Sequence, residues 1–390
     1  MKRSRHLLVL LSSVLLGSSC SPGGPSGPTC EEPAEPGGHW EALLPPPSTV
    51  APGTLQALVK TWTGEELLIW GRPGDPKEVD GEIYRPNAAA YAPVTGTWRD
   101  ITPYGSGYDA VAPGAVWTGK EWILWGGELV GSSGERLASA GGVRIDPASG
   151  QWRAMSPAPI AARVHPSAVW TGKEVLFWGG STADFQVVLD GAAYEPGTDS
   201  WRVLGVEGLV VPPDVEVTPP GAWSGERALF WDWTNTSEPV GLQYDPEEDR
   251  WSPLPVEGAP RPSSGSLWTG QELLVWGYDR DVGFVSGGAY GPKKESWRRL
   301  STRSAPAAGS RTLAGSRMFT WGDYGNGCRV GGIYDIETDT WSTFTSQGAP
   351  SLRYGHTLAW TGHSLLVFGG LGGNEGRSDQ WLGGEFFPDP

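Results

Sequence analysis

Short apolar runs alternate with turn residues along most of this chain, without the periodicity of amphipathic helices. In seven places a Trp-Thr-Gly-like turn precedes an apolar run that ends in an aromatic residue. The first residue of the turn and the last residue of the run are always eight positions apart, as Trp62 and Trp70 are. This fixed interval predicts two β-strands joined by a tight turn, in which glycine supplies a positive φ. The turns are Trp62-Thr63-Gly64, Trp117-Thr118-Gly119, Trp170-Thr171-Gly172, Trp223-Ser224-Gly225, Trp268-Thr269-Gly270, Leu313-Ala314-Gly315 and Trp360-Thr361-Gly362.

A second pair of strands is expected in each segment. An aromatic residue, usually within an aromatic-x-Pro triplet such as Tyr91-Ala92-Pro93, is followed seven positions later by a tryptophan; in one variant, Ile145-Asp146-Pro147, isoleucine replaces the aromatic residue. These tryptophans are Trp98, Trp152, Trp201, Trp251, Trp297 and Trp341. The seventh segment ends at Pro390 without one, and Trp40-Glu41-Ala42-Leu43 matches the missing strand. We therefore predict that the N-terminal strand completes the last unit and leaves no open sheet edge.

Seven such units, 45–55 residues apart, predict an all-β fold. The architecture is a seven-bladed β-propeller of four-stranded blades over residues 39–390, its last blade closed by the N-terminal strand. Two features resemble Kelch repeats: the double glycines Gly126-Gly127, Gly179-Gly180 and Gly369-Gly370, and the lead-in Arg353-Tyr354-Gly355-His356. The chain is thus similar to Kelch-repeat propellers, including the propeller domain of galactose oxidase. That resemblance implies paired aromatic residues packed between blades.

The N-terminus is typical of an exported protein. Lys2, Arg3 and Arg5 precede an apolar run at 7–16 that is too short to span a bilayer, which predicts a signal peptide over residues 1–19. The sequence Gly17-Ser18-Ser19-Cys20 resembles a lipobox, which implies that Cys20 is lipidated and becomes the first mature residue. Residues 20–38 are rich in Pro and Gly and are expected to be a disordered tether. We expect a lipoprotein of the cell envelope, at the outer membrane or surface, or else a secreted protein. The lipid anchor is the only membrane attachment expected.

Loop lengths divide the propeller into two faces. Turns within each pair of strands are constant, whereas connections from strand two to strand three vary between blades. Because loops carry function on a constant scaffold, we expect any binding site on the variable face, around the mouth of the channel. Aromatic rings beside carboxylates there suit a sugar or a cationic peptide group. The candidate ligand-binding residues are Asp232, Trp233, Tyr278, Asp279, Asp323, Tyr324, Arg353 and His356.

These features favour a non-enzymatic binding module for a protein or glycan ligand. The alternatives are a carbohydrate-active enzyme with acidic residues at the channel mouth and a purely structural envelope protein. A net charge of −15 disfavours nucleic-acid partners. No zinc motif is present, and His165, His356 and Cys328 do not match the copper-ligand motifs of galactose oxidase, so we expect no metal, no cofactor and no catalytic residues. A disulfide between Cys30 and Cys328 stays open, as does the oligomeric state.

Overall fold

A computed structural model describes residues 37–45, 59–71, 86–130, 135–211, 220–232, 240–261, 265–279, 284–306, 309–322, 331–343, 345, 347–351, 353–372 and 383–389. Contacts divide the chain into two units, Met1–Pro33 and Ala34–Pro390. The whole first unit lies outside the described residues, as does Cys328. The expected signal peptide, the lipidation of Cys20 and the Cys30–Cys328 disulfide therefore stay predictions. None of the described segments is a helix long and apolar enough to cross a membrane.

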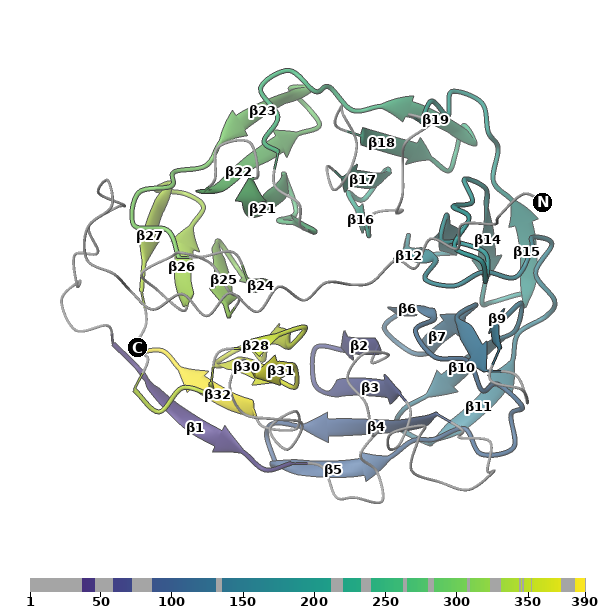
Figure 1. Ribbon diagram of the computed structural model, residues 1–390, viewed down its shortest axis with the longest axis horizontal. Helices are drawn as coiled ribbons and strands as arrows, with labels where there is room; N and C mark the ends of the chain where they lie inside the picture. Colours follow the sequence, from purple (N-terminus) through teal and green to yellow (C-terminus); the bar gives the residue numbers. More distant parts are fainter. Residues whose placement is uncertain are drawn as a thin grey trace, which may run out of the picture. The chain divides into compact units, whose positions relative to one another are not determined.

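The described part of the second unit is all-β, and seven four-stranded antiparallel sheets follow one another around a ring (Figure 1). The predicted seven-bladed propeller is confirmed. In blades one to six the chain runs outward from an inner strand to an outer strand. Blade one contains β2 (Val59–Trp62), β3 (Leu67–Gly71), β4 (Asn87–Ala92) and β5 (Thr97–Asp100), blade two β6 (Gly114–Trp117), β7 (Trp122–Trp125), β10 (Gly142–Asp146) and β11 (Gln151–Ala154), and blade three β12 (Ser167–Trp170), β13 (Val175–Trp178), β14 (Gly191–Glu195) and β15 (Ser200–Val203).

The remaining blades repeat this order, and two short strand pairs are added outside the seven sheets. Blade four contains β16 (Gly221–Trp223), β17 (Ala228–Asp232), β18 (Val240–Asp245) and β19 (Arg250–Pro253), blade five β20 (Ser266–Trp268), β21 (Leu273–Asp279), β22 (Phe284–Gly291) and β23 (Ser296–Arg299), and blade six β24 (Ser310–Ala314), β25 (Arg317–Trp321), β26 (Gly331–Asp335) and β27 (Thr340–Ser342). Blade seven contains β29 (Thr357–Trp360), β30 (Leu365–Phe368), β32 (Gly383–Phe387) and β1 (His39–Leu43). The added pairs are β8 (Glu128–Val130) with β9 (Arg136–Ala138), and β28 (Arg353–Tyr354) with β31 (Leu371–Gly372).

The ring is closed by strands from the two ends of the sequence. Strand β1 pairs with β32, with Trp40 opposite Phe386, and the two lie side by side as the purple and yellow arrows of Figure 1. The Trp40 ring packs against Trp321 of blade six at 4.9 Å, and its Nε1 donates to the carbonyl oxygen of Thr345 at 2.7 Å. Trp40 thus occupies the position of the outer-strand tryptophan in other blades. The expected closure by the N-terminal strand is confirmed.

Aromatic pairs hold neighbouring blades together. At six of the seven joints the aromatic residue that ends strand two of one blade packs against the outer-strand tryptophan of the next blade, so the two sequence columns meet there. A tilted aromatic pair adds stabilisation beyond the area that it buries. Among the described residues the pairs are Trp125–Trp201, Trp178–Trp251, Trp231–Trp297, Trp276–Trp341, Trp321–Trp40 and Phe368–Trp98, with ring centroids between 4.4 and 5.6 Å apart.

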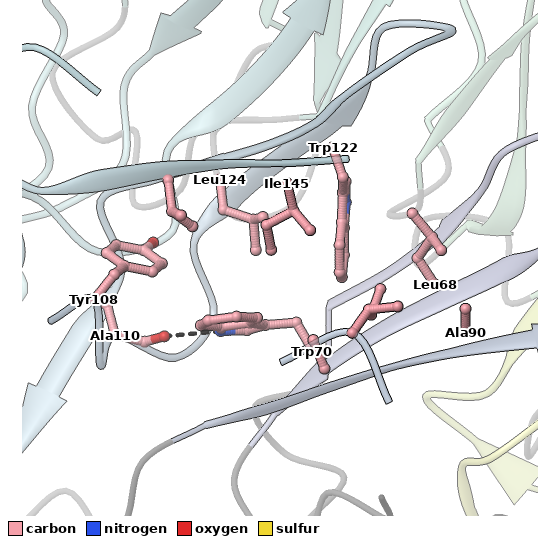
Figure 2. Packing of buried hydrophobic residues seen from close by; sticks show 11 residues of the cluster. Leu68, Trp70, Ala90, Tyr108, Ala110, Trp122, Leu124 and Ile145 are labelled. Atoms are coloured by element: carbon pink, nitrogen blue, oxygen red, sulfur yellow. Dashed lines mark hydrogen bonds between the residues drawn. The ribbon is translucent and has the colours of Figure 1, made fainter. Parts of the chain in front are cut away.

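The joint between blades one and two shows how completely these rings are buried (Figure 2). Trp70 lies between Tyr108 and Trp122, at ring distances of 5.6 and 6.5 Å. Its Nε1 donates to the carbonyl oxygen of Ala110 at 2.8 Å, so the one polar atom of the side chain is satisfied inside the core. Apolar side chains such as Leu124 fill the space around the ring.

The threonine of the Trp-Thr-Gly turn explains why the first interval does not vary. In blade one, Thr63 Oγ1 accepts the backbone N–H of Glu66 at 2.9 Å, and Thr63 N–H donates to the carbonyl oxygen of Glu66. The same side-chain bond recurs at Thr118, Thr171 and Thr269. A turn closed by its own side chain in this way accepts no inserted residue without losing the bond.

A polar network crosses the blade joints at the end of the molecule that carries these turns. In blades two, three and five, a glutamate from the first turn binds an arginine, and that arginine reaches the tyrosine hydroxyl of the next blade. The tyrosine in turn donates to an aspartate in its own outer hairpin, and the aspartate accepts a backbone N–H from the preceding blade. The three sets are Glu121–Arg144–Tyr194–Asp199, Glu174–Arg202–Tyr244–Asp249 and Glu272–Arg298–Tyr334–Asp339.

Substituting the closing tryptophan tests the ring closure. We expect Trp40→Ala to lower the free energy of unfolding by about 3–5 kcal/mol, because it removes a buried aromatic ring from the joint with blade six. Glu41→Ala, on the exposed side of the same strand, is the control and should change stability by less than about 0.5 kcal/mol. Urea denaturation measures both. An unchanged midpoint for Trp40→Ala would contradict the closure.

Because of the inter-blade network, part of the free energy of unfolding depends on pH and is lost in acid. Although burial acts to raise it, the pKa of Asp249 lies below the ordinary value of 3.8, because the hydroxyl of Tyr244, the N–H of Gly205 and Arg202 favour the charged carboxylate. A lowered folded-state pKa means that this stability is present above pH 3.8 and is lost as the pH falls through the folded-state value. We expect Asp249→Asn to lose less stability than the wild type between about pH 5 and about pH 2. Glu248→Gln in the same turn should follow the wild-type curve in urea titrations.

Candidate functional site

The double glycines shape the variable end of the blades that contain them. In blades two, three and seven both glycines have a positive φ, for example 77° at Gly126 and 95° at Gly127. A Cβ atom on Gly127 would lie 2.6 Å from the carbonyl oxygen of Val111, and one on Gly180 would lie 2.5 Å from that of Val164. Any larger residue would therefore push the loop away from the segment that leads into the inner strand.

This close approach adds a short ladder to those three blades. The residue after each double glycine bonds to the lead-in segment, through the bridges Val111–Glu128 and Val164–Ser181 and the pair β28–β31. The bases of these loops are thus built into the scaffold. Blades four, five and six lack the double glycine and carry larger residues at this position.

Arg353 is buried beneath such a loop base in blade seven. Its side chain is 1% exposed, its Nε donates to the carbonyl oxygen of Ser351 at 2.9 Å, and its Nη1 donates to that of Gly369 at 3.2 Å. Arg163 makes the same two contacts in blade three, to Ala161 and Gly179. The predicted ligand contact of Arg353 stays a prediction; in the structure its side chain is buried and bonds the loop base.

His356 lies in the same lead-in, at the register position that Pro113 and Pro166 occupy in blades two and three. The ring packs on Gly322 of blade six, where a Cβ atom would lie 2.4 Å from its Cε1. It is 6% exposed, and its ring nitrogens have only poorly aligned hydrogen bonds, to backbone groups of Trp321 and Arg353, which act to raise its pKa. Burial lowers the pKa of His356 to about 4, and the charge of Lys60 contributes, so the imidazole is neutral at neutral pH.

Lys60 brings a positive charge from blade one to this position. It lies on the inner strand β2, and its ammonium group donates to the carbonyl oxygen of Gly355, next to His356 in the chain. Burial lowers the pKa of Lys60 to about 8. Lys60 and His356 together form the channel-mouth cluster, one cation and one neutral imidazole where blades one and seven meet.

Tyr278 and Asp279 lie in blade five on an extended strand. Without a double glycine, β21 continues past Trp276 and stays paired with β22 as far as Asp279. Asp279 is buried and accepts the hydroxyl proton of Ser286 at 2.9 Å, whereas Tyr278 is 44% exposed. The strand therefore holds the carboxylate inward and presents the phenol at the surface.

The structure brings only some of the predicted residues together. Arg353 and His356 share a lead-in and interact electrostatically, while Tyr278 and Asp279 form a second group in blade five. The side chains of Asp232, Trp233, Asp323 and Tyr324 lie outside the described residues, so their predicted role stays a prediction. Sequence reasoning missed Lys60. The sequence did contain one indication of it: Lys60 is charged, whereas blades two to five have Ala, Ala, Gly and Ser at the same position of the inner strand.

The described residues contain no group of three His, Cys, Asp or Glu side chains able to hold a metal ion.

Comparisons with known proteins identify a fold and no family. No family model matches the chain, and no curated protein is similar to it in sequence. Among solved structures, the chain is similar to a fungal alcohol oxidase of the AA5 family determined in complex with copper. The TM-score is 0.63 at 17% sequence identity, over 90% of this chain and 76% of the oxidase. At this identity the similarity establishes the β-propeller and leaves the activity open.

A pH titration tests the environment of His356. Its folded-state pKa of about 4 lies below the ordinary 6.5, so unfolding takes up a proton between these values. The contribution of His356 to the free energy of unfolding is fully present above about pH 6.5. It falls by about 3 kcal/mol as the pH approaches 4. His356→Pro, which copies blades two and three, should remove this part of the slope in urea titrations. Equal slopes for variant and wild type would show that the ring titrates normally.

Proposed function

We propose that this protein is an extracytoplasmic binding module that holds a glycan at the variable-face mouth of its propeller. The observation that carries the proposal is the channel-mouth cluster, where a buried imidazole has only poorly aligned hydrogen bonds, to backbone groups of Trp321 and Arg353. A neutral imidazole has one donor and one acceptor, and Lys60, which already donates to Gly355, adds up to two further donors. Sugar hydroxyls both donate and accept, so they match this combination, and buried polar groups are normally satisfied.

The exposed phenol of Tyr278 supports a ligand of this class. Aromatic rings at protein surfaces stack on the apolar faces of sugars while their hydroxyl groups stay hydrated. The variable loops lie on the same face of the propeller as Tyr278, because strand β21 ends on that face and strand β28 begins on it. A protein ligand would use the same face, and the binding experiment below separates the two classes.

An enzyme is the second candidate, because the similar solved structure is an alcohol oxidase on the same propeller. The enzyme proposed here is a carbohydrate-active one, in which acidic residues at the channel mouth would act as general acid and base on a glycosidic bond. The expected location, in the cell envelope through lipidated Cys20 or secreted, belongs to this proposal as well.

A glycan array followed by calorimetry tests the binding function. We expect wild-type protein to bind a defined set of glycans, and His356→Pro and Tyr278→Ala to weaken binding at least about tenfold, because each removes a contacting group. Glu65→Ala, in a turn on the opposite face, is the control and should bind as the wild type does. Thermal melting checks that each variant is folded. Normal glycan affinity in both channel-mouth variants, or turnover of a bound glycan, would refute the proposal.

A further inference from the structure

Blade two contains an arginine, Arg153, that takes no part in the Glu–Arg–Tyr–Asp network of that blade. In blades one, three and five, the residue after the outer-strand tryptophan is an arginine that binds the glutamate of the first turn, as Arg99 binds Glu66. Arg153 occupies that position in blade two, but its exposed side chain has no hydrogen bond or ion pair with any described residue. Its place beside Glu121 is taken by Arg144, whose Nη2 lies 2.6 Å from the carboxylate.

The strand register explains this displacement. Arg144 on β10 lies directly opposite Arg153 on β11, so both side chains lie on one face of the sheet. The corresponding strand-three residues of blades one, three and five are Ala90, Ala193 and Ala289. Like charges in directly opposed positions destabilise a sheet. Arg144 is compensated by Glu121, whereas Arg153 is not.

Arg153 faces a cavity between blades two and three, on the face that carries the constant turns. The cavity has a volume of about 540 Å³, within the range of small-molecule sites. Its lining is mostly polar and comes from turns and strand ends of both blades: Lys120, Glu121, Arg144, Asp146, Gln151, Arg153, Pro196, Gly197, Thr198 and Asp199.

The acidic groups of this cavity already have partners. Glu121 binds Arg144 at 2.6 Å, Asp146 accepts the hydroxyl of Ser149 at 2.7 Å, and Asp199 accepts the hydroxyl of Tyr194 at 2.6 Å. Lys120 lies close enough to Asp146 to contribute to lowering the pKa of that carboxyl, after the larger effect of Ser149. Among the cations that line the cavity, Arg144 is ion-paired with Glu121, whereas Lys120 and Arg153 have no ion pair with a described residue.

We infer that this cavity is a second binding site, for an anionic sugar whose oxyanion pairs with Arg153. A guanidinium binds carboxylate or phosphate through two parallel N–H donors, which provides both affinity and orientation. The side chains of Gln151 and Thr198 line the same cavity and can bond sugar hydroxyls. The site is separate from the channel mouth and does not depend on the function proposed there.

Calorimetric titration of the purified wild-type protein tests this inference with three probes: glucuronate, glucose 6-phosphate and methyl glucoside. We expect at least one of the two anions to bind and the neutral glycoside to bind at least about tenfold more weakly. Arg153→Ala should weaken anion binding at least about tenfold. Preference for glucuronate would identify a carboxylate sugar, and preference for glucose 6-phosphate would identify a phosphate ester; either supports the site.

A second variant separates the site from the stability of the blade. Arg144→Ala restores the alanine of blades one, three and five and leaves Glu121 for Arg153. We expect it to fold normally and also to lose anion binding, because Arg153 gains a partner. Arg299→Ala removes an exposed charge from blade five and should leave the affinity unchanged. Normal anion affinity in both Arg153→Ala and Arg144→Ala, equal binding of the glycoside, or no anion binding at concentrations on the order of 10 mM would overturn the inference.

Discussion

The contact on which the whole molecule depends is the aromatic pair across each blade joint. A single four-stranded sheet has two faces and cannot bury either alone. Here the aromatic residue at the end of strand two lies against the outer-strand tryptophan of the next blade, as Trp178 lies against Trp251 at 4.9 Å. Six of the seven joints contain such a pair, and the seventh segment has no outer-strand tryptophan of its own, so the tryptophan for the joint with blade six comes from the start of the chain. Trp40 is that residue.

The two ends of the propeller are stabilised differently, and this difference controls where side chains are available for binding. At the constant end, side-chain hydroxyls close the turns and Glu–Arg–Tyr–Asp sets join the blades. At the variable end, close backbone contacts at double glycines hold the loop bases in blades two, three and seven. Where a glycine or proline of this arrangement is replaced, the larger side chain is placed at the mouth. Tyr278 and His356 both occur at such replacements.

Charge is distributed unevenly over this acidic protein. Although the chain carries a net charge of −15, both proposed sites contain positively charged groups. Lys60 is held among backbone carbonyl groups at the channel mouth, and Arg153 stands beside a cavity whose carboxylates are bound elsewhere. In each place a local departure from the repeat leaves a polar group whose partners within the fold are incomplete. Such departures from a repeating pattern are where ligand binding is most often found.

The sequence by itself determined the seven blades, their four strands and the closure by Trp40, because these depend on intervals and on residue types that recur. It also indicated the double glycines. Only the tertiary structure decided what individual polar residues do. Arg353 reads as a surface residue in the chain, yet it is buried because a neighbouring loop base supplies carbonyl acceptors. Lys60 and His356 come together from blades 296 residues apart in the sequence, and Arg153 is left without a partner because Arg144 reaches Glu121 first. These roles depend on contacts across strands and joints, and the spacing of residues along one chain does not contain that information.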